Sequence, residues 1–207
     1  KRLGQQKVYC PDGKALKEDR TYSADGVGTG KVFDCASGFV VYEGTVDRAM
    51  KPLGVEKRWQ VLGDKQVPLS VISYSDSKAG ELNGVSESYF KNIGVLESRT
   101  TFKDGKKDGD AENWAQFTDG TVKLKTKEKY SAGELIEGIL YKRSGDWPDG
   151  SIATWEFYKG TGYDQKRLSL SFEDDYVSAR SSGYFPVSPA EESLFKKLSS
   201  EDSSQKA

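Results

Sequence analysis

The sequence contains no histidine, and this absence removes several kinds of chemistry. Ser-His-Asp and Cys-His catalysis both need the imidazole ring, which is also the commonest transition-metal ligand. The two cysteines are too few to build a structural zinc site from four protein ligands. We therefore expect a protein that is not an enzyme, with no catalytic residues, no metal and no cofactor. A hydrolase that uses paired carboxylates is the alternative, and Glu173-Asp174-Asp175, the densest acidic cluster, is expected instead to be a polar strand end or turn.

Long apolar runs and an excess of one charge are also missing. No run of about 18 apolar residues occurs, so no transmembrane segment is expected. The 31 basic residues are balanced by 32 acidic ones, so the chain lacks the basic excess that neutralises nucleic-acid phosphates, and nucleic acid is not an expected partner. Only 35% of the residues are hydrophobic and 30% are charged, which favours a thin, elongated fold over a compact two-layer domain.

Glycines and aromatic residues are plentiful, and they recur at a fixed interval. Tyr74, Phe102, Tyr130 and Tyr158 lie 28 residues apart from one to the next. Each is followed by two glycines, which are Gly80 and Gly84, Gly105 and Gly109, Gly133 and Gly138, and Gly160 and Gly162. Because cross-strand aromatic pairs stabilise a sheet, these four rings are predicted to stack on one face and form a thin core.

Each repeat also has a second turn and runs of strand-forming residues. Asn or Asp stands shortly before Gly94, Gly120 and Gly150, as in tight hairpin turns. Between the turns, residues 95–102, 122–130 and 152–158 are rich in β-branched and aromatic side chains. The repeat unit is therefore predicted to be two strands and two turns in about 28 residues.

The amino-terminal part repeats the theme less regularly. Residues 9–13 (Y-C-P-D-G) resemble residues 33–38 (F-D-C-A-S-G), which brings Cys10 and Cys35 to nearly equivalent places in neighbouring hairpins. A disulfide between them is expected if the units stack in register, and free buried thiols are the alternative. Residues 46–70 look like a degenerate unit.

The carboxyl-terminal part differs from the repeats. Leu168, Leu170 and Phe172 alternate with serines, as in a half-buried strand. Ser188-Pro189-Ala190-Glu191 is typical of a helix start, and this helix is predicted to cap the sheet. The predicted organisation is a β-hairpin array over 1–162, a strand and short capping helix over 163–198, and a disordered tail over 199–207.

The repeat resembles a known family. Aromatic-x-x-Gly-Lys-x-x-Gly followed by aromatic-x-x-Asn/Asp-Gly is similar to the MORN repeat and its bacterial variants, in particular the YwqK-type antitoxin repeat. The best-matching segment is 89–109; the resemblance covers 70–162 well and 8–45 weakly. It implies an all-β, mainly antiparallel, elongated meander of consecutive hairpins. Family members are generally binding or scaffolding proteins, some of them proposed as antitoxin or immunity components, and the motif confers no catalytic residues.

The four tryptophans are the predicted contacts to a partner. A single-layer sheet cannot bury both faces of every strand, so some large rings are expected to be exposed, and exposed Trp is a favoured interface anchor. These candidates are Trp59, Trp114, Trp147 and Trp155.

The predicted function is that of an immunity or antitoxin-type protein that neutralises a toxin or secreted effector by steric occlusion. A structural or assembly module of the cell envelope that binds lipid headgroups or glycans is the alternative. The chain begins at Lys1 rather than Met, which fits removal of a leader or a trimmed start. Leader removal and a disulfide would indicate the bacterial periplasm or envelope; the cytoplasm is the other possibility considered.

Overall fold

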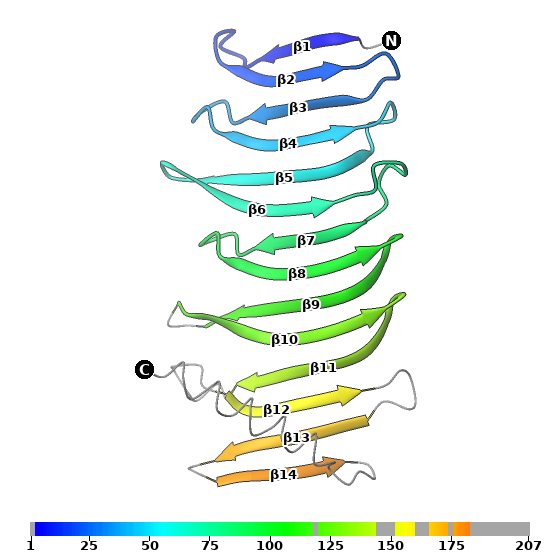
Figure 1. Ribbon diagram of the computed structural model, residues 1–207. Helices are drawn as coiled ribbons and strands as arrows, with labels where there is room; N and C mark the ends of the chain where they lie inside the picture. Colours follow the sequence, from blue (N-terminus) through cyan, green and yellow to red (C-terminus); the bar gives the residue numbers. More distant parts are fainter. Residues whose placement is uncertain (1–2, 118–119, 144–151, 160–165, 174–175, 183–207) are drawn as a thin grey trace.

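The protein forms one open antiparallel sheet in which every strand pairs with its neighbours in sequence (Figure 1). The computed structural model describes residues 3–117, 120–143, 152–159, 166–173 and 176–182, and side chains as far as residue 138. Fourteen strands follow one another in this part of the chain. They are β1 (Gly4–Tyr9), β2 (Leu16–Tyr22), β3 (Gly28–Phe33), β4 (Val40–Val46), β5 (Pro52–Leu62), β6 (Lys65–Ser73), β7 (Gly84–Tyr89), β8 (Leu96–Lys103), β9 (Lys106–Gln116), β10 (Val122–Ser131), β11 (Glu134–Arg143), β12 (Ile152–Lys159), β13 (Lys166–Glu173) and β14 (Tyr176–Ser182).

The predicted all-β meander of consecutive hairpins is therefore confirmed. The described residues include no helix, and hence none long and apolar enough to cross a membrane. The capping helix and the tail predicted beyond residue 187 lie outside the described residues. The strand expected around Leu168–Phe172 is β13, and β14 follows it in the same sheet.

A glycine in the first half of one strand, here called the leading glycine of its hairpin, faces an aromatic residue near the end of the next strand, and this arrangement recurs along the sheet. The leading glycines are Gly4, Gly28, Gly54, Gly84, Gly109 and Gly138. Gly84 pairs with Phe102, Gly109 with Tyr130 and Gly138 with Tyr158. The Tyr74 N–H donates to the Gly54 carbonyl, 2.7 Å away, and Gly4 pairs with Tyr22. In β3–β4 the aromatic residue is replaced, since Gly28 faces Val46. The glycine and aromatic spacing seen in the sequence thus reflects a single cross-strand row.

Each of the first six hairpins also carries a β-bulge at the same place. In every case the register shifts between the fourth and fifth residues after the leading glycine. Bulges increase the local right-handed twist, so one per hairpin curves the whole sheet regularly. Each bulge leaves one residue without a cross-strand register partner; these residues are Lys17, Val41, Leu69, Glu97, Lys125 and Ala153. The region that looked degenerate, 46–70, therefore includes most of a complete hairpin, β5–β6, with this same bulge.

Turn glycines connect one hairpin to the previous one. The N–H groups of Gly80, Gly105 and Gly133 donate to the carbonyls of Pro52, Leu82 and Lys107, at 2.8, 2.9 and 2.8 Å. Each acceptor stands two residues before the leading glycine of the preceding hairpin. The three turn glycines have φ of 82, 77 and 95°, a region in which a side chain is strained. The first glycine of each repeat is therefore needed by the backbone between units.

The sheet has two faces, since side chains alternate along each strand. Face A carries Arg20, Tyr22 and Glu56, and face B carries Asp19, Lys31 and Glu43. Few side chains are fully covered, as expected of a single layer. Those buried among the described residues are Cys10, Tyr22, Val46, Ala111, Arg20 and Glu56, of which all but Cys10 lie on face A.

Cys10 and Cys35 form a disulfide, as expected from the sequence. The bridge joins the turn after β1 to the turn after β3, with 5.8 Å between the two Cα atoms. It therefore ties the first hairpin to the second at one end of the sheet.

Replacing both cysteines by serine should destabilise the first two hairpins. The bridge closes a loop with a sequence separation of 25 residues, for which chain entropy predicts a loss of about 3 kcal/mol. Denaturant unfolding and amide hydrogen exchange measure the effect, and exchange should accelerate in β1–β4 far more than in β7–β10. Uniform acceleration over all strands would contradict a local role for the bridge.

Gly28→Ala should destabilise the protein by about 1–3 kcal/mol, because an added methyl would lie 2.4 Å from the Tyr22 ring. Gly28 has no positive φ, so the effect is steric. In a double-mutant cycle, Tyr22→Leu should relieve part of the cost of Gly28→Ala, as measured by thermal unfolding. Strictly additive effects would show that the ring does not cover this glycine.

Candidate functional site

A cluster of charged and aromatic side chains occupies face A over β2, β4 and β5. Glu18 and Arg20 lie two residues apart on β2, and Glu56 and Arg58 have the same spacing on β5. Residues two apart in a strand point to the same face, so each Glu-x-Arg pair projects together. Tyr42, on β4, is the cross-strand neighbour of Arg58.

The two arginines flank the Tyr42 ring and are each held by a glutamate. Arg20 Nε lies 2.9 Å from Glu18 Oε1, and Arg58 Nε lies 2.7 Å from Glu56 Oε1. Their guanidinium carbons lie 5.7 and 5.9 Å from the centroid of the Tyr42 ring. These distances are within the range of cation–π attraction, so both arginines are oriented before any partner arrives.

Two glycines make room around this cluster. An added methyl at Gly44 would lie 2.7 Å from the Tyr42 hydroxyl oxygen, so the ring extends over Gly44. An added methyl at Gly30 would lie 2.2 Å from the Asp19 carbonyl and 2.9 Å from Arg20 Cβ. The Tyr42 ring therefore lies low over Gly44, whereas Gly30 leaves room for the adjacent backbone of β2 at Asp19 and Arg20.

Burial sets the electrostatics of the cluster. Arg20 is 6% exposed and Glu56 is 4% exposed, whereas the Arg58 side chain is half exposed. Arg20 Nη1 is buried without a hydrogen-bond partner. Burial, and then the nearby Glu56 charge, raise the pKa of Tyr42 and of Tyr74 above the ordinary phenol value. The cluster thus offers oriented guanidinium donors and neutral phenols, a set suited to non-covalent recognition.

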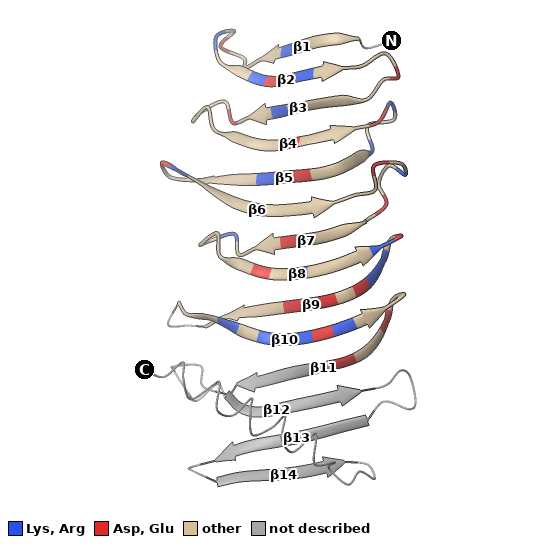
Figure 2. Cartoon of the chain, in the orientation of Figure 1, with Lys and Arg blue, Asp and Glu red and all other residues tan. Residues whose placement is uncertain are grey.

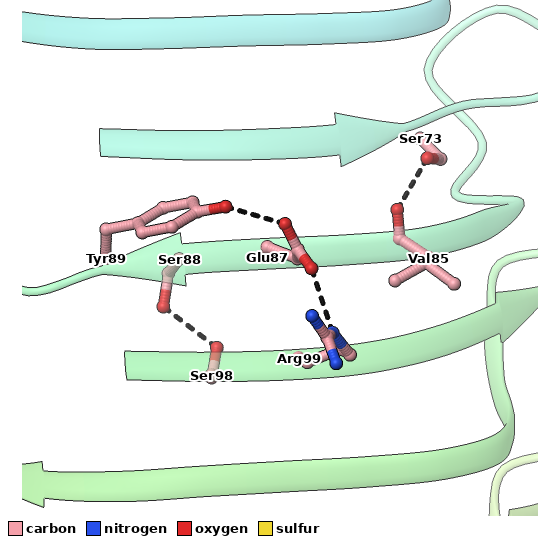
Figure 3. A network of polar contacts seen from close by, with 7 residues as sticks. All are labelled: Ser73, Val85, Glu87, Ser88, Tyr89, Ser98 and Arg99. Carbon is pink, nitrogen blue, oxygen red and sulfur yellow. Dashed lines mark hydrogen bonds and ion pairs between the residues drawn. The ribbon is translucent and has the colours of Figure 1, made fainter. Parts of the chain in front are cut away.

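A second cluster of polar side chains, made of Glu87 and Tyr89 on β7 and Arg99 on β8, lies on face B (Figure 3). The Tyr89 hydroxyl donates to Glu87 Oε2 at 2.7 Å, and Arg99 Nε donates to Glu87 Oε1 at 2.8 Å. The Tyr89 hydrogen bond lowers the pKa of Glu87, and the ion pair with Arg99 lowers it further. Burial, followed by the hydrogen bond to Glu87, raises the pKa of Tyr89 to about 12.

Tyr130 repeats this arrangement on face A. Its hydroxyl donates to Glu128 Oε2 at 2.9 Å, and Lys107 Nζ lies 4.6 Å from the ring centroid. Burial and the hydrogen bond to Glu128 raise the pKa of Tyr130 to about 12. A tyrosine two residues after a glutamate thus donates a hydrogen bond to that glutamate's carboxylate at two places on this sheet.

The predicted residues fall in different places. Tyr74, Phe102 and Tyr130 are half-buried and equivalent in the repeat, and Tyr158 holds the same backbone position. Trp59 and Trp114 are half-buried and also equivalent, each five residues after a leading glycine.

The other two tryptophans can be placed only in part. Trp155 lies on β12, of which the backbone alone is described. Trp147 lies outside the described residues. The structure therefore does not gather the four tryptophans into one described site.

Sequence reasoning missed Arg20, Tyr42, Glu56 and Arg58. The repeated Glu-x-Arg was an available signal, because it indicates two ion pairs on one face. The register that places Tyr42 between the pairs is visible only in the folded sheet. Among the residues whose side chains are described, no group of three or more acidic or cysteine side chains is placed to hold a metal ion.

No family model matches the chain, and no curated protein matches it. The resemblance to MORN-type repeats therefore rests on the motifs in the sequence.

Tyr89 and Tyr130 should remain un-ionised well beyond the pH near 10 at which free phenols titrate. Since the folded pKa lies above the unfolded one, their contribution to stability is fully present below about pH 10 and is lost as the pH rises toward 12. An ultraviolet phenolate titration checks this: Tyr89→Phe should remove one late-ionising group, and Glu87→Gln should make Tyr89 ionise earlier. A titration of wild type with no late phase would contradict it.

Proposed function

We propose that the protein is a non-enzymatic binding protein of the immunity or antitoxin type, which neutralises a toxin or secreted effector by steric occlusion. The observation that carries the proposal is the Arg20–Tyr42–Arg58 cluster on the open face A. The cluster lies on a broad sheet surface, which suits contact with another macromolecule.

The composition of the cluster supports protein recognition. Arginine and tyrosine are among the residues that contribute most to binding when they sit at the centre of an interface. The carboxylates of Glu18 and Glu56 hold the two guanidinium groups in place, so little side-chain entropy remains to be lost on association. A partner that presents a carboxylate would bind the remaining N–H groups of the half-exposed Arg58 guanidinium in a planar, two-point geometry, while the buried Arg20 supports the Tyr42 ring from the other side.

The shape of the sheet supports a mechanism by occlusion. A standard protein–protein interface buries about 1,600 Å2 in total, which a face spanning many strands can supply. A broad, flat cover over an active site or a docking surface blocks access without any chemistry of its own. The resemblance to antitoxin repeats agrees with this role.

The disulfide bears on where the protein acts. Disulfides persist in oxidising compartments, and the bridge between Cys10 and Cys35 is compatible with a protein outside the cytoplasm. We place it in the bacterial periplasm or envelope, where a secreted effector would meet it.

Affinity capture from an envelope fraction tests the proposal, with the whole chain as bait and cross-linking to locate the contact. A protein partner cross-linked to face A is expected. The variant Glu56→Gln/Arg58→Gln removes both charges without leaving a buried carboxylate unpaired, and should weaken binding at least about tenfold. Lys65→Ala, at the exposed first residue of β6 in the same hairpin, is the control and should bind normally.

Thermal unfolding shows whether the variants fold. Equal binding by the folded double variant and wild type would contradict a role for the cluster. Retention of glycans or lipid with no protein would instead favour the envelope-module alternative.

A further inference from the structure

A row of charged residues crosses face B from one strand to the next, three residues after each leading glycine on β1, β3, β5, β7 and β9. Cross-strand register joins its members one by one along ten strands. The row is Lys7, Asp19, Lys31, Glu43, Lys57, Val71, Glu87, Arg99, Glu112 and Lys127. Charges of both signs accordingly recur along neighbouring strands (Figure 2).

The signs of this row invert about its one neutral member, Val71 on β6. Moving outward from Val71, Lys57 on one side corresponds to Glu87 on the other. The following steps correspond in the same way, as Glu43 with Arg99, Lys31 with Glu112, and Asp19 with Lys127. Over these four steps the row is complementary to its own reverse: turning it about Val71 matches each of these eight charges with an opposite one. Lys7, at the fifth step, corresponds to Ile139 and has no charged counterpart.

Apolar residues around Val71 have the same symmetry. Val55 on β5 and Val85 on β7 are 51% and 44% exposed, and both are the first residue after a leading glycine. They share face B with Val71, because Val55 pairs with Ser73 and Val85 lies two residues from Glu87. Trp59 and Tyr89 are likewise equivalent on β5 and β7, at the fifth position. Exposed valines beside a neutral centre form the kind of patch that a partner covers.

We propose that face B binds a second copy of this chain, forming a dimer with a two-fold axis that runs parallel to β6 and passes between the two Val71 side chains. Rotation about this axis keeps the direction of β6 but reverses the order of the strands, so β5 of one copy lies opposite β7 of the other. Val71 then meets Val71, Val55 meets Val85, and Lys57 meets Glu87, each from opposite copies. Glu43 meets Arg99 at the next step outward.

The apolar centre and the charges contribute differently to this interface. Exposed ion pairs are worth little in free energy, so the valines and the rings of Trp59 and Tyr89 supply most of the attraction. The charge row selects the register, because a shift by one strand or the opposite orientation brings like charges together. Intrachain pairs such as Glu87 with Arg99 remain in place and orient the side chains for the partner.

The area is adequate for a specific dimer. Stacked sheets keep their strands within about 30° of each other, which a two-fold axis along β6 allows. The five central strands, about 4.8 Å apart with about 20 Å of contact along each, give about 500 Å2 per copy and about 1,000 Å2 for the pair. Face A remains free, so this dimer goes beyond the proposed function and does not depend on it.

Charge reversal tests the dimer. At about 100 µM, sedimentation should show a dimer of the whole chain, and Lys57→Glu or Glu87→Lys should each weaken it at least about tenfold, because each change places like charges together twice per dimer. The double variant Lys57→Glu/Glu87→Lys should restore the dimer. Lys65→Glu carries the same charge change at the exposed first residue of β6 and should have no effect.

Disulfide trapping tests the position of the axis. The native chain has no free cysteine, so one engineered thiol reports one position. Under mild oxidation Val71→Cys should give a covalent dimer, since the residue meets itself. Val85→Cys alone should not, but Val55→Cys/Val85→Cys should.

Several results would overturn the proposal. One is a wild-type chain that sediments as a monomer, and another is a dimer indifferent to both single reversals. Cross-linking of Val85→Cys equal to that of Val71→Cys would also do so. None of these results bears on binding through face A, so the two proposals can fail separately.

Discussion

The whole fold depends on one constraint, which is that each of the fourteen described strands is hydrogen-bonded only to the described strands before and after it in the chain. A single-layer sheet has no second layer to cover it, so side chains can be buried only by neighbours on the same face. The row of glycines facing aromatic residues satisfies this need, because a ring such as Tyr22 lies over a position where the next strand has no side chain. The bulge in each of the first six hairpins adds regular twist to the same scheme.

This constraint also explains why charged groups take part in what core there is. Arg20 and Glu56 are buried although the sheet is one layer thick, and each has an opposite charge on its own strand. Arginine and glutamate have long stems that can lie along the sheet, and the Tyr42 ring lies beside them over Gly44, where the strand has no side chain. Burial in turn fixes the guanidinium groups around Tyr42, and a fixed group binds a partner at a lower entropic cost.

The two faces therefore offer different surfaces. Face A combines the glycine and aromatic row with the arginine cluster, which suits recognition of another protein. Face B carries a row of alternating charge with valines at its centre of symmetry, which suits a copy of itself. An open sheet can use both at once, whereas a two-layer protein would bury one of its sheet faces internally.

The sequence by itself determined the strand content and the hairpin repeat, and it favoured a bridge between Cys10 and Cys35 over free thiols. The strands and the repeat depend on local turn chemistry and on a spacing of 28 residues, both of which can be read from the order of residues in the chain. The two Glu-x-Arg pairs can also be seen in the sequence, but their positions on either side of Tyr42 depend on the cross-strand register through β3. Only the tertiary structure decided this, together with the equivalence of Trp59 and Trp114 and the inversion of charge about Val71. The physical reason is that bulges shift the partner of each residue by one, so the neighbours across strands follow from the hydrogen-bonded sheet and not from distance along the chain.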